Sequence, residues 1–282
     1  MPYARGTDGV RIHYEVLGRR SSPVVLMIQG LGADKHGWDM QRYLLALRYR
    51  VVAFDNRGAG RSDKPFSAYS LEQMADDALA VLDACEVDRA HVVGASMGGA
   101  LTMLLALRHP ERVQSITLVC TAGRNHQWRR ELLESWMAAA TEQGMGAMSQ
   151  LAARWVIGPR SFRRLMPVFG WLGPLGLNRP AHAFTAQVRA ILAHDDGTTE
   201  LLHQLTMPAM VVVGNQDILT PRGDSEELAE KLPNAELVVI SGAAHGLMIE
   251  HATTFNQVLL EFLNRQVRTQ RAAERHAAAV AS

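Results

Sequence analysis

The chain has 282 residues, and its 29 Lys and Arg nearly balance its 28 Asp and Glu, which leaves a formal net charge of +1. So small a net charge gives no field that would draw the protein onto nucleic acid or an acidic membrane. No stretch approaches the roughly 20 apolar residues of a membrane-spanning helix, and residues 1–9 lack the apolar core of a signal peptide. We expect a soluble cytoplasmic protein without a nucleic-acid partner or membrane anchor, and its oligomeric state stays open.

The chain contains two cysteines, Cys85 and Cys120, and neither has the spacing of a metal or redox motif. We expect both to be reduced thiols that pack inside the protein. We predict no metal and no organic cofactor.

The strand pattern begins with apolar residues at Val10, Ile12, Tyr14 and Val16, which alternate with polar ones as in a half-buried strand. Short, almost wholly apolar runs follow, typical of strands buried on both faces of a parallel sheet. They cover residues 24–28, 51–54, 91–93, 116–119, 210–213 and 237–240. Segments of helical periodicity lie between them, among them residues 71–84, 97–108, 224–231 and 252–263. This alternation predicts an α/β fold with a mostly parallel central sheet and helices on both faces.

The alternation is interrupted between residues 124 and 205, where helix-like segments replace strands. Because strands resume at residue 210, we interpret residues 124–205 as a helical cap inserted into a core of residues 1–123 and 206–265. A cap explains the interruption better than a separate domain does.

Two further segments have a distinctive composition. Residues 165–177 in the predicted cap contain too many Pro and Gly for a regular helix, so this segment suits a mobile lid. The Ala-rich tail, residues 266–282, has no apolar stripe and is expected to be a frayed helix or disordered.

A nucleophile elbow is the first sign of chemistry. Residues 94–99 read Gly-Ala-Ser-Met-Gly-Gly, which places the G-x-S-x-G pattern between a predicted strand and a predicted helix. Such a turn strains the serine backbone and holds its hydroxyl above the sheet edge, at a helix N-terminus that favours negative charge. The pattern alone is common, but this context makes Ser96 the predicted nucleophile.

A serine nucleophile needs a base, and the base needs an acid that fixes its tautomer. Of the 11 histidines, His245 is the one that follows a late predicted strand in a loop of small residues, 241–246. Asp217 follows the predicted strand that ends at Val213. Both loops are expected at the carboxyl edge of the sheet, and the chain order Ser, Asp, His is that of a hydrolase triad. We predict His245 as the base and Asp217 as its orienting acid.

Acyl chemistry also requires backbone N–H groups that face the oxyanion. We predict one from Met97, directly after the nucleophile, and a second from Leu31 in the loop Gln29-Gly30-Leu31-Gly32. The later loop 55–63 is rich in Gly but lacks a Walker lysine and the dinucleotide pattern, so we interpret it as a structural brace.

Together these motifs resemble the α/β-hydrolase superfamily over about residues 3–265, which implies the α/β-hydrolase fold with an inserted helical cap. The superfamily usually has His-Gly where this chain has Gln29-Gly30, a difference that keeps the backbone donor but changes the residue beside it. The segment after His245 is similar to that of non-haem haloperoxidases and perhydrolases. The elbow and the loop 55–63 are similar also to those of enol-lactonases and serine carboxylesterases.

The resemblance implies a serine esterase that cleaves a carboxylic ester, thioester or lactone of a substantially apolar small molecule through an acyl-enzyme. One alternative is a carbon-carbon bond hydrolase or a perhydrolase with the same triad. Carbon-carbon hydrolases typically carry Trp after the catalytic His, where this chain has Gly246. The other alternative is a non-catalytic small-ligand-binding member of the fold, against which an intact triad counts.

The predicted cap is rich in Met and aromatic residues, which suit an adaptable apolar pocket above the serine. It holds four of the chain's five Trp. As substrate-binding residues of the cap we predict Trp128, Trp136, Trp155 and Phe184. For any one of them, simple packing of the cap onto the sheet is the alternative role.

Overall fold

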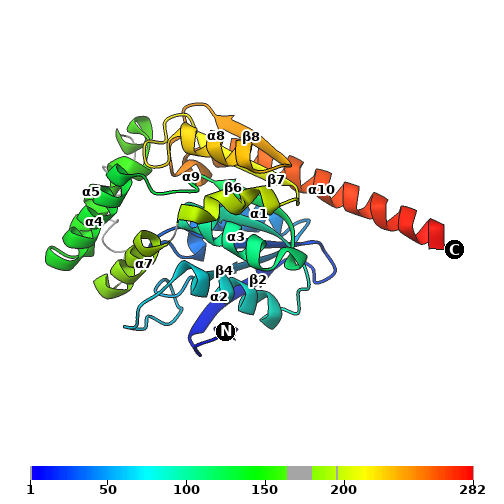
Figure 1. The fold of residues 1–282 in the computed structure, drawn as a ribbon, viewed down its shortest axis with the longest axis horizontal. Helices are drawn as coiled ribbons and strands as arrows, with labels where there is room; N and C mark the ends of the chain where they lie inside the picture. The colour runs from blue at the N-terminus through cyan, green and yellow to red at the C-terminus, as the bar shows by residue number, and fades with distance from the viewer. Residues whose placement is uncertain (1, 164–179, 195, 282) are drawn as a thin grey trace.

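An eight-stranded sheet forms the centre of the computed structural model, which describes residues 2–163, 180–194 and 196–281 (Figure 1). The strand order is β1-β2-β4-β3-β5-β6-β7-β8; β2 is antiparallel to both neighbours, and the other pairs are parallel. This confirms the predicted sheet. The strands are β1 (Tyr3–Arg5), β2 (Arg11–Leu17), β3 (Val24–Ile28), β4 (Arg50–Phe54), β5 (Ala90–Ala95), β6 (Val113–Val119), β7 (Ala209–Gly214) and β8 (Ala235–Ile240).

Helices cover both faces of this sheet because its central strands are apolar on both sides. Consecutive residues of β3 point to opposite faces, so Leu26 and Met27 belong to two different hydrophobic clusters. Met74 of α2 joins the first cluster, and Phe255 of α10 joins the second. The core helices are η1 (Lys35–Trp38), α1 (Asp39–Leu45), α2 (Leu71–Ala84), α3 (Met97–Arg108), η2 (Pro110–Arg112), α8 (Arg222–Lys231), α9 (Leu247–Glu250) and α10 (Ala252–Ala281).

Between β6 and β7 the chain forms a separate helical group on the left of Figure 1: α4 (Gln127–Glu142), α5 (Met145–Val156) and α7 (Ala181–Ala193). The short helix η3 (Asp196–Gln204) follows and packs against α3 and α8 of the core. We call α4, α5 and α7 the cap helices. They share a small core of their own that includes Leu133, Trp136, Met148, Phe184 and Val188. The segment 165–177, for which we expect a mobile lid, lies outside the described residues.

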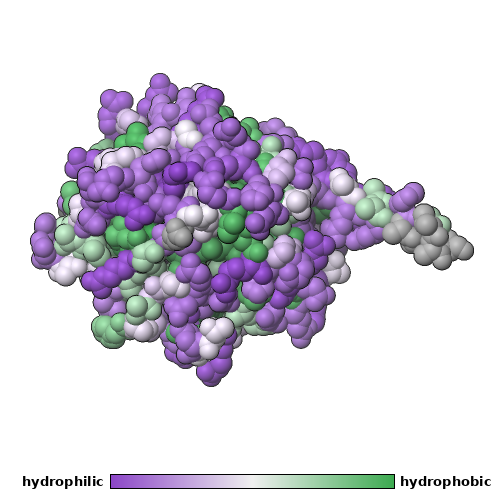
Figure 2. All heavy atoms as spheres, in the orientation of Figure 1, coloured by the Kyte–Doolittle hydropathy of each residue, from purple (hydrophilic) through white to green (hydrophobic). Residues whose placement is uncertain are grey.

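Helix α10 is longer than its apolar pattern predicts. The helix continues through the Ala-rich tail to Ala281 and projects from the body on the right of Figure 1. Figure 2 shows the same face of the molecule as mainly hydrophilic, with its hydrophobic surface in a band across the middle of the view. Within the described ranges, no helix has the length and apolarity needed to cross a membrane.

Candidate active site

Ser96 occupies a strained turn between β5 and α3. Its φ of 53° and ψ of −120° lie in a region that residues other than glycine rarely adopt. Hydrogen bonds on both sides hold the turn in place: the Ser96 N–H donates to Val119 O at 2.9 Å, and its carbonyl accepts from Thr121 Oγ1 at 2.8 Å. The end of β6 and the Thr121 hydroxyl that follows it therefore fix the conformation that projects the serine hydroxyl.

The two glycines of the elbow are required by close backbone contacts. A Cβ atom at Gly94 would lie 2.1 Å from the carbonyl oxygen of Gly98. A Cβ atom at Gly98 would lie 2.3 Å from the carbonyl oxygen of Ile28, at the end of β3. The spacing G-x-S-x-G thus lets the elbow pack against both its own helix and the neighbouring strand.

Asp217 and His245, from the loops after β7 and β8, are hydrogen-bonded to each other. The distance from His245 Nδ1 to Asp217 Oδ2 is 2.9 Å, and both side chains are buried. The other carboxylate oxygen, Oδ1, accepts from the N–H groups of Leu219 and Thr220, each at 2.9 Å. The turn after β7 therefore orients the carboxylate before it meets the imidazole.

The environment of Asp217 favours its ionised form. Burial alone would raise the pKa of this carboxyl, but the charge of His245 and the hydrogen bonds from His245 and Thr220 outweigh burial and lower it. An ionised carboxylate only accepts hydrogen bonds, so His245 Nδ1 carries the proton. The other ring nitrogen, Nε2, is then the one that can accept a proton from a nucleophile.

Thr220 and Cys120 lie beside this pair, and the sequence did not predict a supporting role for either residue. The Thr220 hydroxyl donates to Asp217 Oδ2 at 2.8 Å and lies 3.2 Å from His245 Nδ1. Its position three residues after the aspartate is the available sequence signal, because Asp side chains often bond to the backbone of the turn they begin. The buried Cys120 thiol lies 3.9 Å from Ala244 O, and burial raises its pKa well above the ordinary value, which keeps it neutral.

The loop after β3 brings backbone N–H groups to the serine. A Cβ atom at Gly30 would lie 3.7 Å from Ser96 Oγ. The Gly30 N–H itself donates to its neighbour Gln29 Oε1 at 2.9 Å. Within the described parts of the chain, the N–H groups of Leu31 and Met97 make no hydrogen bond to a protein acceptor. These two amides are therefore available to a ligand. Gln29 stands where the superfamily usually has His, and its side chain accepts from Gly30 N–H and from neither of these two amides.

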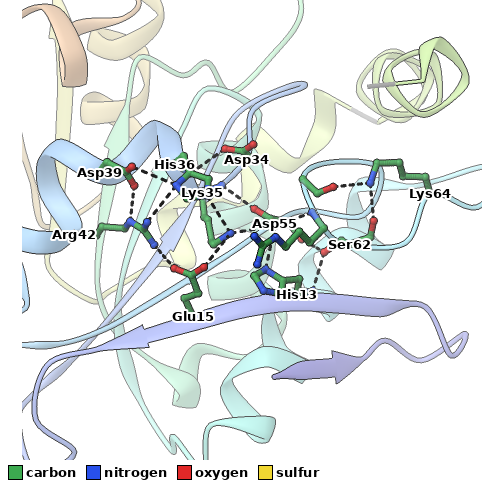
Figure 3. Close-up of polar contacts among 12 residues, drawn as sticks. His13, Glu15, Asp34, Lys35, His36, Asp39, Arg42, Asp55, Ser62 and Lys64 are labelled. Atoms are coloured by element: carbon green, nitrogen blue, oxygen red, sulfur yellow. Dashed lines mark hydrogen bonds and ion pairs between the residues drawn. The ribbon is translucent and has the colours of Figure 1, made fainter. Parts of the chain in front are cut away.

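The loop 55–63 braces the site from the side. Asp55 accepts hydrogen bonds from the backbone N–H of Lys35 at 2.9 Å and of Arg61 at 3.0 Å, and it lies at the centre of the polar network in Figure 3. Asn56 Nδ2 donates to Gln29 O at 2.8 Å. The bonds to Lys35 and Gln29 tie this loop to the segment that follows β3, as a structural brace would.

A cavity of about 550 Å³ lies under the cap helices, and its wall includes Ser96, His245, Leu31 and Met97. The rest of the wall is mainly apolar and contains Met103, Leu133, Met148, Ile157 and Ile191.

The four predicted substrate-binding residues of the cap divide into two pairs. Trp136 and Phe184 belong to the cavity wall. Among the residues that the structure describes, that wall includes neither Trp128 nor Trp155, which stack on each other with ring centroids 6.1 Å apart. Of these four predicted residues, Trp136 and Phe184 therefore remain candidates for substrate contact.

A mostly parallel sheet that carries its serine on a strand-turn-helix elbow defines an α/β-type hydrolase. Comparison with known proteins agrees with that class. The chain belongs to the alpha/beta hydrolase fold family, whose profile matches residues 23–252.

Individual relatives share most of the chain. It is 31% identical over 261 residues to a protein of Caulobacter vibrioides named as the carbamate hydrolase RutD, a match that covers 89% of this chain and 95% of that protein. The enol-lactonase of Burkholderia xenovorans LB400 has a TM-score of 0.86 at 28% identity, and covers 93% of this chain and 100% of its own. Est816, described as an N-acyl homoserine lactone degrading enzyme, has a TM-score of 0.77 at 31% identity with the same coverage. This chain is an α/β-fold hydrolase.

Proposed function

We propose that this enzyme hydrolyses a carboxylic ester, thioester or lactone of a substantially apolar small molecule, with Ser96 as nucleophile, His245 as base and Asp217 as orienting acid. The observation that supports this most is the 2.9 Å pair of Asp217 and His245, because its histidine lines the same apolar cavity as Ser96. The names of the relatives describe reactions at carbamate and lactone carbonyls, which belong to the same class of electrophile.

In the first half of the reaction, Ser96 Oγ attacks the acyl carbonyl carbon while His245 Nε2 takes the hydroxyl proton. The N–H groups of Leu31 and Met97 donate to the oxyanion, and Asp217 stabilises the imidazolium. When the intermediate collapses, the bond to the leaving group breaks and His245 returns its proton to that group. An acyl ester on Ser96 remains.

In the second half, a water molecule attacks the acyl-enzyme and gives its proton to His245 Nε2. The carbon-oxygen bond to Ser96 then breaks, the serine oxygen regains the proton, and the acid product leaves. The reaction consumes one water and needs no other co-reactant.

The test is covalent labelling of Ser96 by a fluorophosphonate, mapped by peptide mass spectrometry. The proposal expects one label, on Ser96, and expects Ser96→Ala to lower kcat by about 10⁶-fold, to the residual rate given by binding and the oxyanion donors. Ser149 also lines the cavity and is not on the elbow, so Ser149→Ala is the matched control and should keep the label on Ser96. A label on another residue of an active preparation would contradict the assignment.

A parallel screen of esters, thioesters, lactones and a dienone defines the substrate class. Turnover of the first three kinds is expected. Turnover of the dienone alone would favour the carbon-carbon hydrolase instead.

A further inference from the structure

A side chain of the cap lies buried directly behind the loop that carries Leu31. Gln187 of α7 is 1% exposed; its Oε1 accepts a hydrogen bond from Gly32 N–H at 2.8 Å, and its Nε2 donates to the carbonyl of Arg57 at 2.7 Å. One amide thus joins three segments that are far apart in the sequence: the cap, the loop after β3 and the loop after β4.

Gly32 allows the turn after β3 to adopt either of two backbone conformations. The Ala33 N–H donates to Gly30 O at 3.1 Å, so residues 30–33 form a turn whose central peptide joins Leu31 to Gly32. Gly32 has a φ of +65°, which is typical of the third position of a type II turn. A glycine there also permits the type I turn, in which the central peptide is rotated by about half a circle. The turn itself therefore does not determine which way this peptide faces.

The surroundings of Arg57 fix the orientation of the Gln187 amide. The guanidinium is 0% exposed and donates to Asp77 at 2.6 and 2.8 Å and to Asp8 at 2.8 Å. These bonds hold Arg57 in place, so the Arg57 backbone carbonyl is a fixed acceptor. The NH₂ group of Gln187 must face this carbonyl. The Gln187 oxygen then faces Gly32, where it accepts the peptide N–H in the observed turn and would meet the Leu31 carbonyl in the rotated one.

The Leu31 N–H belongs to the peptide directly before the one that Gln187 orients, so it keeps its place only while the whole turn is held. We propose that Gln187 is a positioning residue that holds the turn 30–33, and with it the Leu31 N–H, in place beside Ser96 for the oxyanion. This inference rests on the proposed function, in which Leu31 is one of two oxyanion donors. It follows that the cap helix α7 supports the turn that carries an oxyanion donor, in addition to forming part of the cavity wall. The oxyanion donors are fully aligned when α7 is seated on the core.

The kinetic test is Gln187→Met, which keeps the length of the side chain but can neither accept from Gly32 nor donate to Arg57. We expect kcat to fall about 10- to 100-fold, less than the 10²- to 10³-fold loss of a whole oxyanion donor, while KM changes less than about threefold. Val188→Ala is the matched control, because Val188 is the next residue of α7 and is buried in the cap core. This control should keep kcat within about twofold. An unchanged kcat in Gln187→Met, or an equal fall in both variants, would overturn the proposal.

A second measurement does not depend on activity. Hydrogen exchange of the segment 30–33 should become faster in Gln187→Met and stay unchanged in Val188→Ala, because Gly32 N–H loses its acceptor in the first variant alone. Unchanged exchange in Gln187→Met would overturn the assignment whatever happens to kcat. If Ser96→Ala retained full activity, the proposed function would fail, but the exchange experiment would still report on Gln187.

A third variant separates the two hydrogen bonds. Gln187→Glu keeps an acceptor for Gly32 but cannot donate to Arg57 when ionised, so it should keep the turn protected and lose less kcat than Gln187→Met. Equal losses of protection in the two variants would count against selection of the turn by the acceptor. Gln187→Asn, whose amide is one methylene too short to reach both partners, replaces Gln187→Met if that variant does not fold.

Discussion

Among the described residues, two buried histidine-aspartate pairs have nearly the same local geometry. His245 Nδ1 is 2.9 Å from Asp217 Oδ2, and His13 Nδ1 is 3.1 Å from Asp55 Oδ2. In each pair the aspartate follows directly or closely on a parallel strand of the sheet. The contact between the two side chains therefore does not distinguish a catalytic pair from a structural one.

The surroundings of the pairs differ. Asp217 accepts further bonds from neutral backbone and hydroxyl groups, and its histidine lines the cavity beside Ser96. Asp55 lies 3.5 Å from the buried ammonium of Lys35, and within the described residues the second ring nitrogen of His13 is buried without a hydrogen-bond partner (Figure 3).

The chemical consequence follows from these surroundings. Burial and the charge of Lys35 lower the pKa of His13, which favours its neutral form, and its Nε2 is buried and has no hydrogen-bond partner among the described residues. A histidine-aspartate pair becomes a proton-transfer device when its second nitrogen opens onto a nucleophile and a substrate cavity. The pair at His13 instead joins β2 to the loop 55–63.

Within this comparison, the largest expected effect comes from the same substitution in each pair. Asp217→Asn should lower kcat by about 10⁴-fold, because an amide at this position favours the wrong imidazole tautomer. Asp55→Asn should leave kcat within about tenfold and instead reduce the free energy of unfolding by about 3 kcal/mol, since it leaves Lys35 with a weakened set of buried partners. Steady-state kinetics and urea unfolding of both variants separate the two outcomes. A similar loss of kcat in both variants would contradict the different roles given to the two pairs.

A smaller effect concerns pH, and it separates the proposed base, His245, from a buried histidine outside the site. Burial lowers the pKa of His91, on β5, to about 4. The unfolded chain takes up that proton near pH 6.5, so the unfolded state binds more protons between these values and stability falls as the pH falls through that window. A shift of that size corresponds to about 3 kcal/mol for His91, and His13 contributes in the same direction.

The corresponding measurement is urea unfolding from pH 7 to pH 4, set beside kcat/KM over the same range. His91→Gln should flatten the dependence of stability on pH and leave the pH profile of kcat/KM unchanged. If His91→Gln unfolded with the same pH dependence as the parent protein, the buried neutral state of His91 would be wrong.

The sequence predicted the sheet and the loops of the proposed triad because a strand followed by a tight turn leaves a local pattern. It did not predict the pair of His13 and Asp55, since the two residues are 42 positions apart and His13 looks like any residue of a half-buried strand. The link from Gln187 to Gly32 spans 155 positions and leaves no periodic signal at all.

Helical periodicity likewise failed to decide which cap aromatic residues face the cavity. Trp128 and Trp155 stack on each other, whereas Trp136 and Phe184 line the wall, although all four are large aromatic residues of the cap. The direction of each side chain depends on how α4, α5 and α7 pack together, and that packing is a property of the tertiary structure.

The smallest expected effect tests whether the cavity beside His245 selects for apolar acyl groups. Its mainly apolar wall should stabilise each added methylene by up to about 0.8 kcal/mol, so kcat/KM should rise severalfold from acetyl esters towards medium chains. Because Phe184 belongs to the wall and Trp128 does not, Phe184→Leu should shift the preferred chain length and Trp128→Leu should leave it in place. The measurement is kcat/KM for esters from acetyl to decanoyl with the parent protein and both variants. A maximum at acetyl, or the same shift in both variants, would show that the cap aromatic residues serve packing alone.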